Sequence, residues 1–237
     1  MQVEHDTFAA TLRDRGCEVL YFEELLREVL EQPDVRKSLV GEVASDLRVS
    51  SGTLRKDIEA LLLEKSAAAL ASTLLAGLAK SEVNHADEEK RLSFYIKEVY
   101  PFYIDPLPNL YFSRDYGTVI GDRLSVNTMK AKARRRESML LEYIARNHPR
   151  FKKAEVDLWH RYDEADSIDG GDILILSDQV VAIGCSARTS AEAIEELASR
   201  LFTEDEQVNE VIVVQIPFAR AYMHLDTVFT MVDRDKF

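Results

Sequence analysis

An imidazole and a carboxylate lie two residues apart near the end of the sequence, in the run 221–233 (AYMHLDTVFTMVD). We interpret this run as a strand, in which His224 and Asp226 share one face because successive side chains alternate. A carboxylate stabilises and orients a charged imidazole, so the pair could move protons near neutral pH. Most such pairs are surface or satisfied polar pairs, so the rest of the sequence must decide.

Aspartates recur at regular spacing upstream of this pair. Asp115, Asp172 and Asp226 each open a predicted strand and are 57 and 54 residues apart. The first two are followed by a hairpin, a helix and a further strand, in the order 118–126, 130–147 and 156–159, then 172–183, 190–201 and 210–216. We therefore predict an α/β fold of ββαβ pseudo-repeats, with a further strand at 109–115.

The repeat pattern begins and ends in the middle of a unit. An array interrupted in this way leaves unpaired edge strands and open apolar faces. We therefore expect either a fragment or a subunit completed by other chains, and homo-oligomerisation stays open.

A long stretch after the first predicted strand has a different character. Residues 23–98 carry apolar side chains at helical spacing and no convincing strand, which predicts an inserted all-helical bundle. We expect residues 1–22, with a helix at 4–15 and a short buried strand at 17–22, to belong with residues 99–237 to the incomplete repeat domain.

The composition limits the choice of partners. A net charge of −12 and a pI near 5.0 argue against nucleic acid or an anionic membrane, and fit a cationic small molecule better. The two cysteines, Cys17 and Cys185, have neither metal-ligand nor disulfide spacing, which favours the cytoplasm. No signal peptide is evident, and the apolar run 67–79 is too short to cross a bilayer.

Repeated strand starts would bring acidic residues around one mouth, as in radially repeated folds. The residues expected there are Asp115, Asp169, Asp172, His224 and Asp226. Carboxylates accept paired hydrogen bonds from a guanidinium group, and Gly170 and Gly171 let backbone approach a ligand. Arg134 and Arg188 could hold a carboxylate at the far end of the same ligand. The inferred ligand is L-arginine.

Other interpretations of these residues stay open. Aspartates at strand ends often only cap turns, which we prefer for Asp122, Asp178 and Asp233. A metal site of His224, Asp226 and Asp115 ranks below the guanidinium site because it contains a single histidine. We therefore expect neither a metal nor a cofactor.

Several segments resemble the arginine deiminases, within the wider guanidino-modifying superfamily. The similar segments are 108–115 (PNLYFSRD), 133–137 (ARRRE), 170–172 (GGD), 187–190 (ARTS) and 224–233 (HLDTVFTMVD). With the helical insert, the resemblance covers essentially the whole chain. It implies a pentein-like α/β propeller of five-fold pseudosymmetry, and a hydrolase acting on linear amidines that converts L-arginine and water to L-citrulline and ammonia.

The resemblance also implies roles for individual positions. Asp115 and Asp226 would grip the guanidinium, and His224 would be the general acid and base. Asn109, Arg134 and Arg188 would fix the amino-acid end. Asp169 stands where the family usually has glutamate, and Asp172 and Gly171 belong to the same substrate-binding motif.

The family attacks the guanidinium carbon with a cysteine thiolate, which forms a covalent intermediate that water resolves. Neither Cys17 nor Cys185 matches that position, and a buried structural thiol is the better interpretation of Cys185. We therefore expect a central portion of an arginine deiminase that lacks both ends and is inactive alone. The alternatives are a non-catalytic arginine-binding or interaction protein, and another guanidino-modifying hydrolase or amidinotransferase.

Overall fold

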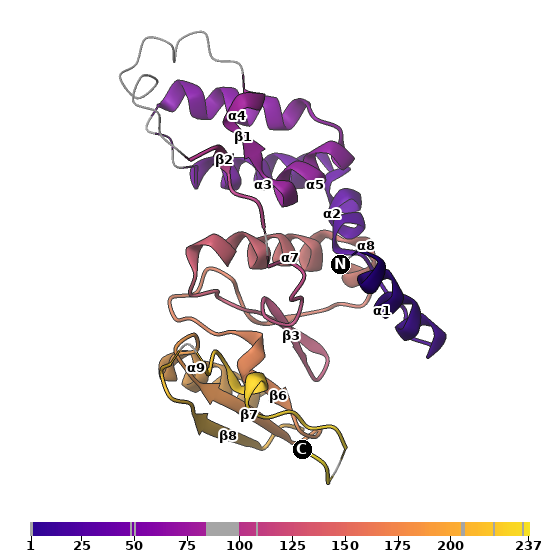
Figure 1. Ribbon diagram of the computed structural model, residues 1–237, viewed down its shortest axis with the longest axis vertical. Coiled ribbons are helices and arrows are strands. Elements are labelled where there is room, and N and C mark those ends of the chain that lie inside the picture. The colour runs from indigo at the N-terminus through magenta and orange to yellow at the C-terminus, as the bar shows by residue number, and fades with distance from the viewer. Residues whose placement is uncertain are drawn as a thin grey trace. The chain divides into compact units, whose positions relative to one another are not determined.

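The computed structural model describes residues 2–47, 49, 51–83, 100–107, 109–204, 207–219, 221–233 and 235–237. The chain divides into two compact units, Met1–Ile104 and Asp105–Phe237 (Figure 1). None of the helices found in these ranges is long and apolar enough to cross a membrane.

The first unit is largely helical over its described residues. Its helices are α1 (Gln2–Asp14), α2 (Phe22–Leu30), α3 (Pro33–Ser45), α4 (Gly52–Glu64) and α5 (Ala67–Ala76). Ser51 and Ser66 accept hydrogen bonds from the backbone at the starts of α4 and α5. Leucines at helical spacing, such as Leu26, Leu30 and Leu62, are fully buried and form the core.

Two details of this unit differ from the sequence-based expectation. The stretch expected as a buried strand at 17–22 is neither a strand nor buried, and Phe22 already begins α2. A short strand, β1 (Leu78–Ala79), pairs with β2 (Phe102–Ile104) where no strand was expected. The unit boundary follows Ile104, and the assignment of residues 1–22 to the repeat domain stays a prediction. Residues 84–98 of the predicted bundle, and residue 99 after it, lie outside the described ranges.

The second unit contains two copies of the predicted hairpin, helix and strand. The first consists of β3 (Gly117–Ile120), β4 (Arg123–Val126), α7 (Arg135–Asn147) and β5 (Leu158–His160), with α8 (Pro149–Lys153) before β5. The second consists of β6 (Ile173–Ile175), β7 (Val180–Cys185), α9 (Ala191–Glu204) and β8 (Glu210–Gln215). Each forms a three-stranded sheet with one antiparallel and one parallel pairing (Figure 1).

The two copies share a hydrophobic core. Ile120 and Trp159 from the first copy pack with Ile173, Val181 and Leu197 from the second. Alternate residues of β6 and β7, including Leu174 and Ala182, form a smaller cluster with Leu225 on the opposite face. The unit is therefore a mixed α/β fold in which both faces of the second sheet are covered, at least in part.

Short segments were assigned wrongly from the sequence. Residues 109–115 form consecutive turns rather than a strand, with Phe112 N donating to Asn109 O and Asp115 N donating to Phe112 O. Asp226 does not open a strand, because Leu225–Thr227 is a single 3₁₀ turn, η5. The strand β8, expected to be buried, is mostly exposed because it is the edge of its sheet.

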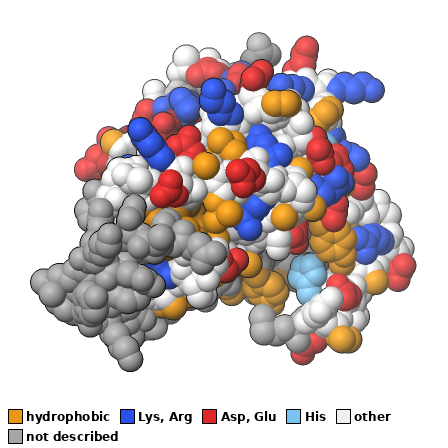
Figure 2. All heavy atoms as spheres, turned by 90° about the horizontal axis from the view of Figure 1, so that it is seen from above, with side chains coloured by type: hydrophobic (Ala, Val, Ile, Leu, Met, Phe, Trp, Pro, Cys, Tyr) orange, Lys and Arg blue, Asp and Glu red, His pale blue; other side chains and the backbone are white. Residues whose placement is uncertain are grey.

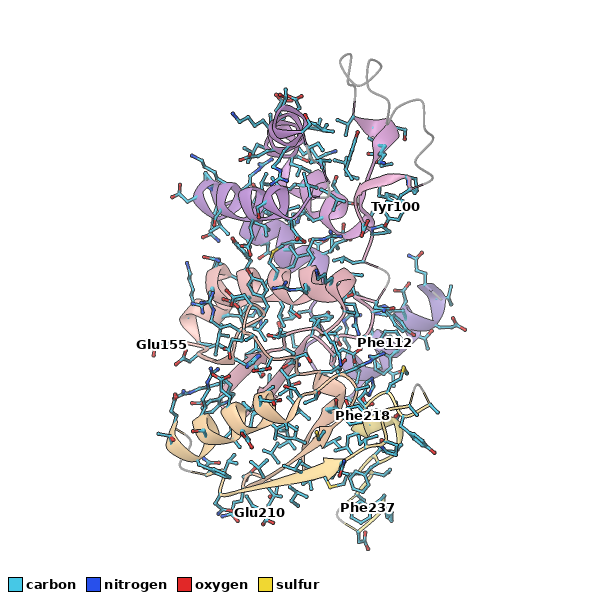
Figure 3. The ribbon with its side chains drawn as sticks, turned by 90° about the vertical axis from the view of Figure 1, so that its left-hand side faces the viewer. Tyr100, Phe112, Glu155, Glu210, Phe218 and Phe237 are labelled. Carbon is cyan, nitrogen blue, oxygen red and sulfur yellow. The ribbon has the colours of Figure 1, made fainter. Side chains whose placement is uncertain are left out.

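Aromatic side chains are exposed on the second unit. Phe112, Phe218 and Phe237 are all more than half exposed, and all three are labelled in Figure 3. Charged side chains of both signs are interspersed across the face shown in Figure 2, so the net negative charge is not concentrated there.

Candidate functional site

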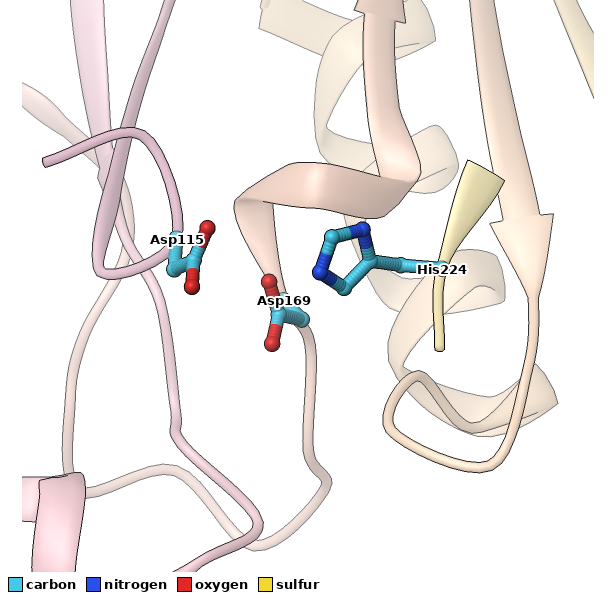
Figure 4. A group of neighbouring side chains, drawn as sticks. All are labelled: Asp115, Asp169 and His224. Carbon is cyan, nitrogen blue, oxygen red and sulfur yellow. The ribbon is translucent and has the colours of Figure 1, made fainter. Parts of the chain in front are cut away.

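Three polar side chains from separate segments of the second unit meet at one place. Asp115 comes from the turns before β3, Asp169 precedes the 3₁₀ turn η4 (Gly170–Asp172), and His224 precedes η5. One ligand atom from each lies within 4.8 Å of the others, and all three residues are buried. Figure 4 shows the Asp169 carboxylate between Asp115 and the imidazole. The predicted convergence of repeat starts is therefore present for these residues.

Backbone contacts hold the Asp115 turn in this position. Its carbonyl oxygen accepts from Gly170 N at 2.8 Å and from the Asn127 side chain at 3.0 Å. The Arg114 guanidinium donates to the carbonyl of Ile173 at 2.8 Å. The turn before the first sheet is thus tied directly to the turn before the second sheet, which fixes the two carboxylates relative to each other.

The two glycines have different neighbours. A Cβ at Gly170 would lie 2.0 Å from the Arg114 carbonyl oxygen, so the backbone needs glycine there. A Cβ at Gly171 would lie 2.4 Å from His224 Nδ1, because the imidazole packs directly on this glycine. In this structure Gly171 therefore gives space to the histidine rather than to a ligand.

His224 is hydrogen-bonded to Asp226, two residues further along the same segment. Its Nδ1 contacts the Asp226 carboxylate. That hydrogen bond is the largest influence raising the pKa of His224, against the opposing effect of burial, and Asp169 and Asp115 raise it further. The ring is therefore biased toward its charged form, with Nε2 left for a proton transfer or a ligand.

Asp169 carries two internal contacts. Its Oδ1 accepts from Gly171 N at 3.0 Å, and its Oδ2 accepts from Arg188 Nη1 at 3.3 Å. Burial is the main cause that raises the pKa of Asp169, and repulsion from Asp115 adds to it. A cation bound between the Asp115 and Asp169 carboxylates, in addition to Arg188, would relieve that repulsion.

Arg134 joins Asp115 to a buried glutamate that sequence reasoning assigned no role. Arg134 donates to Asp115 Oδ2 at 2.7 Å and to Glu137 Oε2 at 2.9 Å. Glu137 is fully buried, and this burial is the main cause that raises its pKa. The sequence contains a signal for this ion pair, because residues three apart on a helix are neighbours and Arg134 and Glu137 have opposite charges.

The remaining predicted residues are placed as follows. Arg188 is one-third exposed and donates to Met223 Sδ as well as to Asp169. Asn109 is half-buried and its carbonyl oxygen accepts from Arg134 at 3.4 Å. Asp172 is fully buried beneath the site, where Ser186, Thr189 and Leu225 N donate to its carboxylate.

This arrangement suits a planar cation with several N–H groups. Each of two site carboxylates already accepts hydrogen bonds from a guanidinium of the chain itself, Asp115 from Arg134 and Asp169 from Arg188. The cluster of Asp115, Asp169 and His224 also has the donor types of a divalent metal site. Two adjacent guanidinium groups oppose a doubly charged ion, which favours the organic cation.

Neither cysteine is a member of the cluster of Asp115, Asp169 and His224. Cys17 is exposed in the first unit, and Cys185 ends β7, half-buried against the shared core. The surroundings of Cys185 agree with a packing role.

The family model and the curated relatives that match this chain agree on one family. The family model described as "Arginine deiminase" matches residues 1–237. Arginine deiminase from Bacillus cereus (strain ATCC 10987 / NRS 248) is 45% identical over 237 residues, which are 100% of this chain and 58% of that protein. Arginine deiminase from Staphylococcus aureus (strain MRSA252) is 44% identical, over 100% of this chain and 57% of that protein. The chain thus spans less than two thirds of these relatives.

Among solved structures, DDAH from Pseudomonas aeruginosa complexed with citrulline aligns with a TM-score of 0.39 at 22% identity, over 64% of this chain and 59% of that one. A dimethylarginine dimethylaminohydrolase adduct with 4-chloro-2-hydroxymethylpyridine aligns with a TM-score of 0.36 at 23% identity, over 48% and 43%. These alignments are too weak to carry an argument, whereas the family model covers every residue. The chain belongs to the arginine deiminase family.

Proposed function

We propose that this chain carries the arginine-binding and proton-transferring part of an arginine deiminase, which converts L-arginine and water to L-citrulline and ammonia. The observation that supports this most is the buried meeting of Asp115, Asp169 and His224, where two carboxylates already bind guanidinium groups of the chain. A substrate guanidinium would exchange with the more exposed of these, Arg188, at Asp169.

The roles follow from the contacts. Asp115 and Asp226 accept hydrogen bonds from the substrate guanidinium, and Asp169 lies within reach of the same space. The freed guanidinium of Arg188, with Arg134 and Asn109, binds the amino-acid end. His224 donates a proton to the departing ammonia and takes one from the attacking water, which a pKa raised by Asp226 supports.

The covalent step needs a thiolate, which attacks the guanidinium carbon and is later displaced by water. Neither Cys17 nor Cys185 is assigned this role. We therefore propose that the 237 residues bind L-arginine without hydrolysing it. The same two repeats are proposed as part of a pentein-like propeller, in which equivalent strand starts face one mouth.

Isothermal titration of the 237-residue chain with L-arginine tests this proposal. L-Arginine should bind, and Asp115→Asn and Asp226→Asn should each weaken binding roughly tenfold through loss of a charged acceptor. Asp122→Asn changes an exposed turn residue of the first hairpin and should leave binding unchanged.

Two further titrations define the ligand. Agmatine, which lacks the carboxylate, should bind more weakly than L-arginine if Arg134 and Arg188 hold that group. Zn²⁺ in place of L-arginine tests the metal alternative. No binding of L-arginine contradicts the proposal, and citrulline formed by the purified chain contradicts its inactivity.

A further inference from the structure

Asp172 connects the three segments that build the site. Its Oδ2 accepts from Ser186 Oγ at 2.7 Å and from Thr189 Oγ1 at 2.6 Å. Its Oδ1 accepts from the backbone N–H of Leu225 at 2.8 Å. The carboxylate is fully buried, so three donors replace the water that a charged group would otherwise bind.

Ser186 and Thr189, whose hydroxyls donate to Asp172, also accept hydrogen bonds from the backbone of two site residues. Ser186 Oγ accepts from the backbone N–H of Arg188 at 3.0 Å, which fixes the loop that presents this guanidinium. Thr189 Oγ1 accepts from the backbone N–H of Asp169 at 3.0 Å, which fixes the second carboxylate of the site. One buried carboxylate therefore sets the backbone positions from which Asp169 and Arg188 extend.

The third hydrogen bond fixes the histidine segment. Leu225 lies between His224 and Asp226, and its N–H points at Asp172. Leu225 has no strand partner among the described residues, and its η5 turn is held by local hydrogen bonds such as Thr227 N to His224 O. The bond to Asp172 therefore ties the backbone of this turn to the second sheet, beside the packing of the Leu225 side chain against Leu174 and Ala182.

The surrounding backbone is shaped for this carboxylate. A Cβ at Gly184 in β7 would lie 2.4 Å from Asp172 Oδ1, so glycine leaves the space that the carboxylate fills. An amide at position 172 would place an N–H donor either against the two hydroxyls or against the Leu225 N–H, all of which already donate to this side chain. The network accordingly requires an acceptor at both oxygens.

We propose that Asp172 is a positioning residue rather than a substrate ligand, and that it holds His224, Asp169 and Arg188 in register for a bound guanidino compound. The inference rests on the proposed function for the identity of that ligand. The positioning role itself concerns how the segments of the site are held together, and this can be measured without the ligand.

The test compares Asp172→Asn with Asp178→Asn, an exposed aspartate at the turn between β6 and β7. The His224 ring signal is titrated by NMR, and the L-arginine Kd is measured on the same samples. We expect D172N to lower the pKa of His224, because the ring leaves the carboxylates that stabilise its charge. L-Arginine binding should weaken roughly tenfold. D178N should change neither.

Thr189→Val and Thr189→Ser provide a second pair if D172N does not fold. Valine removes the hydroxyl at nearly constant shape and should change the His224 titration, whereas serine retains the hydroxyl and should restore it. The wild-type chain gives an independent measurement, because the Leu225 amide should exchange slowly with solvent.

The outcomes separate the two claims. An unchanged His224 titration in the folded variants, or rapid exchange of the Leu225 amide in the wild type, overturns the role of Asp172. Absence of L-arginine binding by the wild type overturns the proposed function, while the His224 titration and the Leu225 exchange still decide the positioning role.

Discussion

Asp226 influences the charge state of His224 more than any other neighbouring residue does. Asp226 contributes the hydrogen bond that raises the imidazole pKa, and the more distant carboxylates of Asp169 and Asp115 act in the same direction. Burial acts against them. A base placed in this way keeps its proton when an ordinary histidine would lose it, which suits a group that must donate to a leaving amine.

Replacing Asp226 with asparagine should therefore lower the pKa of His224, because the charged acceptor is lost while the side-chain shape is kept. NMR titration of the ring protons measures the change. His160 is the internal control, since its own pKa is lowered mainly by burial and its ring lies beside Thr128 and Glu164. An unchanged or higher His224 pKa in D226N would show that the pair is not coupled.

The same pair affects stability with a definite sign. A histidine whose folded pKa is raised stabilises the fold most below its unfolded pKa, and this contribution disappears as the pH rises through the folded pKa. The difference in unfolding free energy between wild type and D226N should accordingly be largest in mild acid and shrink above neutral pH.

At the scale of elements, the η4 turn brings the carboxylates and the imidazole together. Gly170 faces backbone and Gly171 faces a movable ring, so the two positions should respond differently to the same added methyl group. Backbone cannot move away from a Cβ at 2.0 Å without disturbing the turn before β3, whereas an imidazole can rotate.

Gly170→Ala should therefore destabilise the second unit by about 1–3 kcal/mol. Gly171→Ala should leave stability closer to wild type but displace His224, and so change its titration and weaken L-arginine binding. Gly41→Ala is the control, because a Cβ there meets nothing within 4 Å and alanine favours a helix. Urea unfolding and the His224 titration distinguish the two variants. Equal effects of G170A and G171A would contradict this account.

Much of the second unit could be predicted because its elements have clear periodicity. The hairpin at 118–126, the helices around Leu140 and Leu197, and the repeat itself all follow from apolar spacing and turn residues. The convergence of Asp115, Asp169 and His224 followed from the repeat. Periodicity does not reveal whether an extended segment has a partner, which is why 109–115 and 221–233 were wrongly predicted as strands.

Local hydrogen bonds explain why the segment that contains His224 and Asp226 is not a strand. The Thr227 hydroxyl and backbone N–H both donate to the His224 carbonyl, which closes a turn that a strand would not form. His224 and Asp226 are still neighbours, but across a turn rather than along one face of a strand. The buried contacts of Glu137 and Asp172 depend on tertiary packing, which a single sequence does not show.

At the scale of the whole molecule, the two units have separate cores. Leu26, Leu30 and Leu70 are buried in the first, while Trp159 is buried in the second and is the single tryptophan of the chain. Units with their own cores tend to unfold as separate cooperative transitions. Tryptophan fluorescence reports the second unit, whereas far-UV circular dichroism reports the helices of both.

Urea unfolding followed by the two signals should give transitions that do not coincide. Leu70→Ala should shift the circular dichroism transition by about 2–5 kcal/mol of lost stability and leave the fluorescence transition in place. Leu197→Ala, a buried leucine of the second unit, is the matched variant and should move the fluorescence transition. Coincident transitions that both variants shift together would show one cooperative unit.

The pairing of Asp115 with Arg134 and of Asp169 with Arg188 also bears on the choice of denaturant. Guanidinium chloride supplies the same ionic group that these carboxylates bind in Arg134 and Arg188. We therefore expect it to stabilise the fold as a ligand at low concentration, before it acts as a denaturant. Urea carries no charge and lacks this second action. Stability curves from the two reagents will therefore diverge at their dilute ends, and the size of that divergence measures how open the carboxylates are to an incoming guanidino group.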